Sequence, residues 1–303
     1  MKPEPDPSTS VASHYDAVAD TYHEQYDRDL LVTVKDYPAN YFRLQLLLDS
    51  FVQRGLKRVI EVGVGEGTPL GTLAQAGIDV AGFDISERMV ERSKERMREL
   101  GLDENRILHA DIRDPPTYAP LLENGPFDGL MAMGVMPHVD DDDMTLENMR
   151  ALVRPGGSVF IEFRNKLFSL FTFNRLTLEF VLDDLLADVS TELRSLVEAE
   201  LAPRLRLDLP PIRATTPDGN APGYDAILSK FHNPLEAETL FGRHGFENIR
   251  LRWYHYHPAP PMIEVQAPAA FREQAFALEH ESSGWRGLFL CSAYVVEATK
   301  PAR

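Results

Sequence analysis

A run of alternating glycines offers the clearest chemistry in this sequence. Residues 59–68 read Val-Ile-Glu-Val-Gly-Val-Gly-Glu-Gly-Thr, so an apolar run leads directly into Gly63, Gly65 and Gly67. Glycine tolerates positive φ and lets a ligand lie against the main chain. A second apolar run, 80–84, ends in the carboxylate of Asp84. A glycine turn followed by an acid at the end of the next strand is the layout of a nucleotide-binding α/β unit, in which the acid meets ribose hydroxyls.

Two kinds of nucleotide cofactor compete for this layout. A dinucleotide site requires G-x-G-x-x-G, with a helix amino terminus at the pyrophosphate. Here Thr68 stands where the third dinucleotide glycine belongs, and Glu61 lies in the strand just before the turn. A carboxylate is unfavourable beside a pyrophosphate but acceptable near a cation. Glu61 therefore weighs against an NAD(P)-dependent dehydrogenase, which stays an alternative.

The residues resemble those of class I S-adenosylmethionine-dependent methyltransferases, whose first motif is E/D-x-G-x-G-x-G. The further matches are Asp84, the segment His109-Ala110-Asp111-Ile112, the segment 127–133, and a Pro-Gly-Gly turn within 152–161. This resemblance implies S-adenosyl-L-methionine as the cofactor. It also implies an α/β, Rossmann-like fold with a mixed seven-stranded sheet flanked by helices. A non-catalytic subunit that binds the cofactor without turnover is a further alternative.

The resemblance also implies a set of pocket residues. Asp84 is expected to accept from the ribose hydroxyls and Asp111 from the adenine amino group, while the N–H of Ile112 meets the ring. The segment 14–22 resembles the N-terminal helix of quinone-type methyltransferases, where a tyrosine closes the pocket; an aromatic face packed on the core is the alternative. The expected cofactor-binding residues are Tyr15, Tyr22, Glu61, Gly63, Gly65, Gly67, Asp84, Ile85, Met89, Asp111, Ile112, Met133 and Gly134.

His138 follows the fourth expected strand. Ligands of open parallel sheets sit beyond the carboxyl ends of the strands, so His138 is placed near the reacting groups. Histidine titrates near neutrality and is our candidate catalytic base; a histidine that bonds the backbone and shapes the pocket is the alternative. The acidic run 140–143 is interpreted as a helix cap rather than a metal site, and no metal is expected.

The chain divides into five expected parts: a flexible tail (1–13), an N-terminal helical cap (14–55), a cofactor-binding core (56–163), a lid insertion (164–230), and the rest of the core (231–303) with a second insertion at 258–284. Tyr15, Tyr22 and Tyr26 are expected on one face of a helix over 11–27. The apolar stretch at 167–181 must pack on something, either as a lid or as a homodimer interface. The expected substrate-binding residues are Arg164, Tyr224, His232, Arg252, Tyr254 and His255.

Composition narrows the function. The formal net charge of −16 argues against general nucleic-acid binding, which needs basic residues to neutralise phosphates. The single Cys291 excludes an internal disulfide, and the absence of a long apolar run argues against a membrane span, so a cytoplasmic protein is expected. The expected activity is methyl transfer to the oxygen of a small molecule, with nitrogen or carbon as alternative acceptor atoms.

Overall fold

The computed structural model describes residues 6–33 and 36–303. Its central sheet is seven-stranded with the order β3-β2-β1-β4-β5-β7-β6. The strands are β1 (Arg58–Val62), β2 (Asp79–Asp84), β3 (Ile107–His109), β4 (Phe127–Ala132), β5 (Val153–Arg164), β6 (Glu247–Tyr256) and β7 (Cys291–Thr299). The first five run parallel, and β7 is antiparallel to both of its neighbours. The predicted mixed seven-stranded sheet is confirmed.

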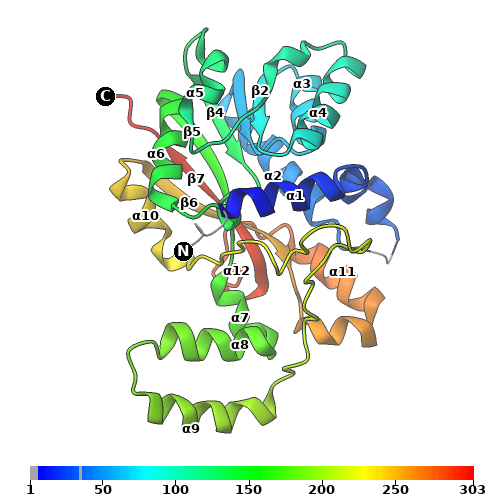
Figure 1. Ribbon diagram of the computed structural model, residues 1–303, viewed down its shortest axis with the longest axis vertical. Helices are drawn as coiled ribbons and strands as arrows, with labels where there is room; N and C mark the ends of the chain where they lie inside the picture. Colours follow the sequence, from blue (N-terminus) through cyan, green and yellow to red (C-terminus); the bar gives the residue numbers. More distant parts are fainter. Residues whose placement is uncertain (1–5, 34–35) are drawn as a thin grey trace.

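Helices cover both faces of this sheet (Figure 1). One face packs on α2 (Ala39–Arg54), α3 (Thr68–Gln75) and α4 (Glu87–Glu99), and the other on α6 (Asp142–Leu152) and α10 (Ala237–Arg243). Val59 and Ile60 are adjacent in β1 yet belong to the two different core clusters, because successive side chains of a strand point to opposite faces. This burial on both faces explains the continuous apolar runs in the sequence.

The amino-terminal part differs from the prediction. Helix α1 spans Pro7–Val18, so the predicted tail ends earlier than residue 13; residues 1–5 lie outside the described part. The side chain of Asp6 accepts from the N–H of Ser8, and Pro7 occupies the first turn, which together form a strong start signal. The predicted helix over 11–27 is also wrong in extent. After Val18 the chain continues as short 3-10 turns, η1 (Tyr22–Tyr26) and η2 (Arg28–Leu31), so Tyr15 and Tyr26 do not share a helix.

The chain leaves the sheet twice at its carboxyl edge, after β5 and after β6. The first excursion forms a lobe with η6 (Lys166–Phe168), α7 (Ser169–Thr172), α8 (Arg175–Glu179), the π-helix η7 (Phe180–Leu185) and α9 (Thr191–Leu201), which Figure 1 shows below the sheet. It returns through irregular chain and η9 (Pro234–Glu236). The second excursion contains η10 (Pro261–Gln266) and α11 (Pro268–Leu278). The sequence pattern over 183–201 predicts one amphipathic helix, but only α9 is α-helical there.

The sequence predicts the last strand over 287–298, but this strand starts later. Residues Gly287–Leu290 form a helical turn, α12, and β7 begins at Cys291. Gly287 lies against the indole of Trp253, and a Cβ at this position would come within 2.2 Å of that ring. The close contact with β6 therefore fixes the turn before the strand starts.

No helix among residues 6–33 and 36–303 combines the length and the apolar character that crossing a bilayer would require. The remaining short helices are η3 (Glu104–Arg106), α5 (Pro115–Tyr118), η4 (Ala119–Leu122) and η5 (Met136–His138) in the core, and η8 (Ala202–Arg204), which follows α9 in the lobe.

Candidate active site

The glycine turn after β1 adopts a conformation that excludes larger residues. Gly63 and Gly65 have φ of 73° and 54°, in the left-handed region. A Cβ at Gly63 would also approach Val135 Cγ2 to 2.6 Å. Gly67 serves another purpose, because it precedes α3 and packs on Ser93 of α4, away from the pocket. The turn between Val62 and Glu66 thus keeps its main chain open to a ligand.

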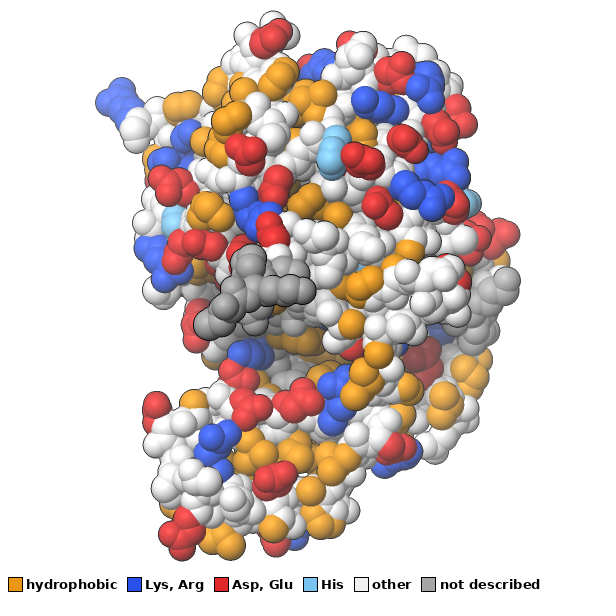
Figure 2. Space-filling model, in the orientation of Figure 1, with side chains coloured by type: hydrophobic (Ala, Val, Ile, Leu, Met, Phe, Trp, Pro, Cys, Tyr) orange, Lys and Arg blue, Asp and Glu red, His pale blue; other side chains and the backbone are white. Residues whose placement is uncertain are grey.

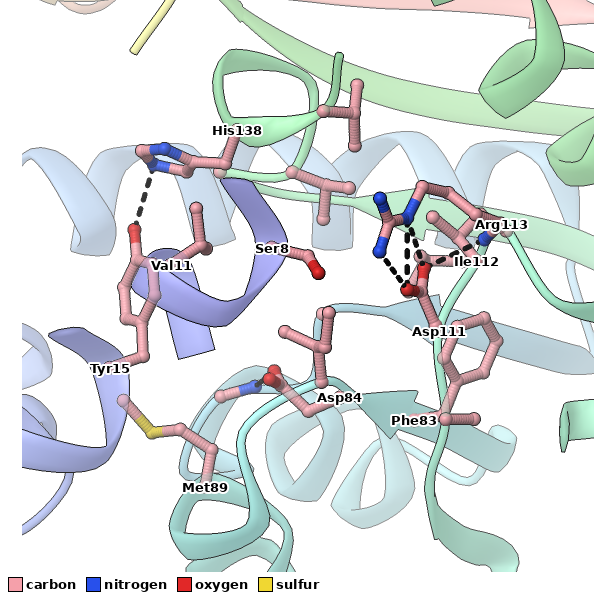
Figure 3. Close-up of a pocket in the computed structure, with 18 of the residues that line it drawn as sticks. Ser8, Val11, Tyr15, Phe83, Asp84, Met89, Asp111, Ile112, Arg113 and His138 are labelled. Atoms are coloured by element: carbon pink, nitrogen blue, oxygen red, sulfur yellow. Dashed lines mark hydrogen bonds and ion pairs between the residues drawn. The ribbon is translucent and has the colours of Figure 1, made fainter. Parts of the chain in front are cut away.

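Asp84 ties this turn to the end of β2. Its Oδ2 accepts from the N–H of Gly65 at 2.9 Å, and its Oδ1 accepts from the N–H of Ser86 at 2.9 Å. Burial raises the pKa of this carboxyl group, although both N–H bonds act to lower it. Figure 3 shows Asp84 reaching toward the centre of the pocket from below. The Asp84 side chain therefore both joins the glycine turn to the end of β2 and lines the cavity.

The cavity lies at the carboxyl edge of the sheet and encloses about 850 Å³ when its open mouth is included. Most of the predicted cofactor-binding residues line it: Tyr15, Tyr22, Gly63, Gly65, Asp84, Ile85, Met89, Asp111, Ile112, Met133 and Gly134. Glu61 and Gly67 do not line it. His138, the predicted base, does.

Helix α1 contributes more of the pocket wall than the predicted Tyr15. Its Pro7, Ser8 and Val11 also line the pocket, and Figure 3 shows Ser8 and Val11 on this helix beside the cavity. The capping pattern of Asp6 and Pro7 was the available signal that this stretch is ordered. The strand ends and the glycine turn thus form the floor of the pocket, and helix α1 forms part of its cover.

Arg113 is a further unpredicted wall residue, and it engages Asp111. The Nη2 and Nε atoms of Arg113 donate to Asp111 Oδ2 at 2.6 and 3.0 Å, and Nη1 donates to Asp6 at 3.0 Å. Asp111 was expected to accept from an adenine amino group. Its carboxylate lines the pocket and also accepts from Arg113, which links the pocket rim to the start of α1.

Glu61 is buried beside the glycine turn, and its Oε2 has no partner among the described residues. Burial raises the pKa of Glu61 well above its usual range, although the nearby Arg43 acts to lower it. An unpaired buried carboxyl oxygen is costly, so the position is prepared for a cationic or hydrogen-bond-donating group. This oxygen lies behind the glycine turn, outside the cavity lining, and can accept from a ligand's ammonium group only if that group reaches it there.

His138 organises the upper wall of the pocket. Its Nδ1 lies 2.7 Å from the carbonyl oxygen of Leu228, so Nδ1 carries the proton and Nε2 the lone pair. The hydroxyl of Tyr15 lies 3.0 Å from Nε2, and that of Tyr224 lies at 3.4 Å. Burial lowers the pKa of His138 to about 4. The imidazole is therefore neutral at physiological pH, and its lone pair already accepts a hydrogen bond.

The structure places some of the predicted substrate-binding residues beside His138 and others away from it. Tyr224 contacts His138, and the guanidinium of Arg164 lies over the Tyr224 ring at 4.4 Å. Arg252 lies 3.7 Å from Glu297 and lines neither described cavity. The hydroxyl of Tyr254 donates to the buried Glu162 at 2.7 Å, and Glu162 also pairs with Arg43.

The alternation of side chains along a strand predicts that Tyr254 and Tyr256 share a face, but in β6 this alternation is broken at His255. This residue has a φ of 59°, its ring stacks on Tyr37 at 5.0 Å, and Tyr254 and Tyr256 on either side of it pack into different core clusters. The prediction that Tyr254 and Tyr256 share a face is therefore wrong. Because the residue between them has a left-handed backbone conformation, the side chains of Tyr254 and Tyr256 point to opposite faces of the sheet.

A second cavity of about 1250 Å³, including its open mouth, lies between η7 of the lobe, the end of β5 and α10. His232 lines this cavity, and its Nε2 lies 3.0 Å from Asp142. The space-filling view shows the molecule hollowed between the lobe and the body (Figure 2). In the acidic run 140–143, Asp141 caps α6 through the N–H of Met144, as predicted.

The strand order, the antiparallel β7 and the glycine turn define the class I methyltransferase architecture. Residues 59–157 match the family profile described as "Methyltransferase domain". The chain is 32% identical over 126 residues to the ubiquinone biosynthesis O-methyltransferase of Aromatoleum aromaticum, covering 42% of this chain and 52% of that protein. It is 28% identical over 148 residues to the same enzyme of Coxiella burnetii, covering 47% and 58%. The chain thus spans about half the length of the curated relatives it matches.

Solved structures show the same fold over nearly the whole chain. The magnesium protoporphyrin IX methyltransferase of Synechocystis PCC 6803, crystallised with bound SAH, superposes with a TM-score of 0.53 at 16% identity and covers 97% of this chain and 100% of its own. A possible histamine N-methyltransferase of Thermotoga maritima gives 0.51 at 16% identity, with 94% and 98% coverage. These solved structures show that the chain has the class I methyltransferase fold, and its residues 59–157 match the methyltransferase domain profile.

Proposed function

We propose that the protein transfers a methyl group from S-adenosyl-L-methionine to a small-molecule acceptor, with oxygen as the receiving atom. The observation that carries this proposal is one cavity at the carboxyl edge of the sheet, lined by the open glycine turn and by Asp84. The similarity to ubiquinone biosynthesis O-methyltransferases supports oxygen as the acceptor atom.

The residues present fit this cofactor. The left-handed Gly63 and Gly65 leave room for its amino-acid end, and the unpaired Oε2 of Glu61 suits its ammonium group. Asp84 can still accept from ribose hydroxyls, because each carboxylate oxygen has a second lone pair. When bound, S-adenosyl-L-methionine supplies an electrophilic methyl carbon on a sulfonium ion. The chain then has to hold acceptor and methyl group close and in line, and to exclude water.

Helix α1 suits the exclusion of water. Four of its residues line the pocket, its Tyr15 contacts His138, and its Asp16 accepts from the N–H of Arg88 at 3.2 Å. We propose that α1 and the lobe after β5 form the cover of the reaction site. We propose that the second cavity, between the lobe and the sheet, is the path by which the acceptor arrives.

We propose that His138 positions the cover rather than removing the acceptor's proton. Its Nε2 accepts from Tyr15, and a conjugate acid with a pKa of about 4 makes a weak base at neutral pH. Turnover of a His138→Gln variant at saturating cofactor should keep the pH profile of the wild type. If the rise of turnover with pH disappeared in the variant, His138 would be the catalytic base after all.

The deciding experiment is titration calorimetry with S-adenosyl-L-methionine, S-adenosyl-L-homocysteine and NAD, followed by an assay of S-adenosyl-L-homocysteine release over a panel of small phenols and amines. We expect both adenosyl ligands to bind and NAD to be rejected. Tight NAD binding would favour a dehydrogenase. Binding without turnover on any acceptor would favour a non-catalytic subunit.

We also propose a homodimer formed through α9. This helix has no buried residue, and Leu193 and Leu196 are 54% and 61% exposed. Sedimentation of the wild type and a Leu193→Asp, Leu196→Asp variant tests it. A wild type that stays monomeric at micromolar concentration would contradict this proposal.

A further inference from the structure

Arg164 differs from the other interior arginines around the reaction site. Arg43 pairs with Glu162, and Arg113 pairs with Asp111. Arg164 stands at the end of β5, is half-buried, and forms no ion pair with a carboxylate of residues 6–33 or 36–303. A cation that is partly desolvated without a counter-ion is unfavourable unless another group compensates it.

Packing holds the Arg164 guanidinium in place. It lies 4.4 Å from the centre of the Tyr224 ring and 5.0 Å from that of Phe231, and one nitrogen donates to Ser229 Oγ at 2.8 Å. Stacking on aromatic faces fixes the plane of a guanidinium without satisfying its remaining N–H groups. Within the described residues, no Arg164 nitrogen is both buried and unpartnered, so its other donors face accessible space.

Tyr224 connects this cation to the reaction site. Its ring is in contact with Arg164, and its hydroxyl lies 3.4 Å from Nε2 of His138, which lines the cofactor pocket. Phe231, the second ring under Arg164, lines the cavity between the lobe and the sheet. Arg164 itself lines neither cavity, but it packs on Phe231 of the one and, through Tyr224, reaches His138 of the other.

We infer that Arg164 binds a carboxylate of the methyl acceptor, so that the substrate is a small organic acid. The inference rests on the proposed methyltransferase function. A planar guanidinium matches a carboxylate with two parallel hydrogen bonds. A phosphate dianion would call for more positive charge, but the nearby Arg213 and Lys230 are already paired with Asp225 and Asp142. The aromatic walls of Tyr224 and Phe231 favour an acid with a flat ring.

Arg213 provides the matched control. Its guanidinium also lies over the Tyr224 ring, at 4.8 Å, but it donates to Asp225 at 3.1 Å. Replacing either arginine removes one charge beside the same ring. The two differ in their partners: Nε and Nη2 of Arg213 donate to the Asp225 carboxylate, whereas the Arg164 side chain donates only to Ser229 Oγ.

The test is calorimetry on the S-adenosyl-L-homocysteine-saturated protein, with hydroxylated aromatic acids such as 4-hydroxybenzoate, larger naphthoates, and their uncharged amides. We expect at least one acid to bind about tenfold more tightly than its amide. Arg164→Gln should abolish this preference, Arg164→Lys should retain part of it, and Arg213→Gln should leave it unchanged.

Absence of an acid preference throughout the panel, or a preference that survives Arg164→Gln, would overturn the inference. A thermal melt of each variant shows whether it folds; if Arg164→Gln does not, the intermediate preference expected of Arg164→Lys decides. Failure of S-adenosyl-L-homocysteine to bind the wild type would instead reject the proposed function, so the two failures are distinguishable.

Discussion

The floor and the cover of the pocket are built in different ways. The floor comes from the ends of neighbouring strands, and its critical contacts involve the main chain, as in the bonds from Gly65 and Ser86 to Asp84. The cover comes from segments far apart in the sequence, joined by side chains. Tyr15 meets His138 across 123 residues, and His138 meets Leu228 across 90.

This difference assigns ligand affinity to the floor and stability to the cover. The floor depends on backbone conformations that few residues adopt, so it fixes which cofactor fits. The cover depends on a few side-chain bonds of modest strength, each contributing about 1 kcal/mol. We therefore expect changes in the floor to act on ligand affinity, and changes in the cover to act on stability and pH dependence.

The largest effect is expected from Asp84→Asn in the floor. Both carboxylate oxygens accept from N–H groups, so an amide nitrogen would face a donor in either orientation. Affinity for S-adenosyl-L-homocysteine should fall about a hundredfold, or roughly 3 kcal/mol, by calorimetry. Asp103→Asn is the control, because Asp103 also accepts from a backbone N–H but lies in an exposed turn. Unchanged affinity in Asp84→Asn would contradict the pocket assignment.

His138 should give the cover a marked sensitivity to acid. Its folded-state pKa of about 4 lies below the usual 6.5, so the unfolded chain binds the proton more tightly. The associated stability is complete above pH 6.5 and is lost between pH 6.5 and 4, by up to about 3 kcal/mol. Urea unfolding at pH 7 and pH 5 should show a smaller loss for His138→Gln than for the wild type. His23→Gln, at an exposed histidine, should keep the wild-type loss.

Glu61→Gln sharpens the comparison, because it should affect stability and affinity in opposite directions. The raised pKa means that the fold holds the proton of Glu61 more tightly, so its contribution to stability declines as the pH rises above 4.5. Gln should therefore stabilise the free protein by about 1 kcal/mol at pH 8, and by less at pH 4.

The same variant should bind S-adenosyl-L-homocysteine about tenfold less tightly and adenosine equally well, if Glu61 meets the ammonium group. Glu66→Gln is the matched control: Glu66 is buried too, but its oxygens accept from the N–H and hydroxyl of Thr68. That variant should lose stability. Equal weakening of adenosine binding in Glu61→Gln would show a general disturbance of the floor.

The smallest effect is expected from Tyr15→Phe. It removes one hydroxyl from His138, and Tyr224 at 3.4 Å can move to replace it. The free energy of unfolding should fall by no more than about 1 kcal/mol. Tyr41→Phe serves as the control on the next helix. A loss several times larger would mean that the cover is as specialised as the floor.

The floor could be predicted from the sequence because it depends on local patterns. Glycines at alternate positions predict an open turn, and an acid at the end of a strand predicts a side chain at the carboxyl edge of the sheet. Each of these predictions needs only a few neighbouring residues. Asp84 and Asp111 both follow parallel strands, and the carboxyl ends of parallel strands share one edge of the sheet. The sequence therefore predicts that both side chains line one pocket.

The cover could not be predicted in the same way. Nothing near His138 indicates that Leu228 accepts from it, because that contact depends on how a long irregular segment returns to the sheet. Alternation failed at His255 for a similar reason, since a single left-handed residue changes every side-chain direction after it. Asp6 and Pro7 do indicate the start of α1, but acids and prolines near a chain end are also typical of a tail.

The link from Asp6 through Arg113 to Asp111 bears on how this protein should be prepared. A fusion or affinity tag placed ahead of Asp6 would be anchored at the rim of the pocket, and a tag rich in acidic residues would compete for Arg113. The carboxyl terminus emerges at the opposite side of the sheet from the lobe (Figure 1). Attachment there keeps the purification handle clear of the chemistry.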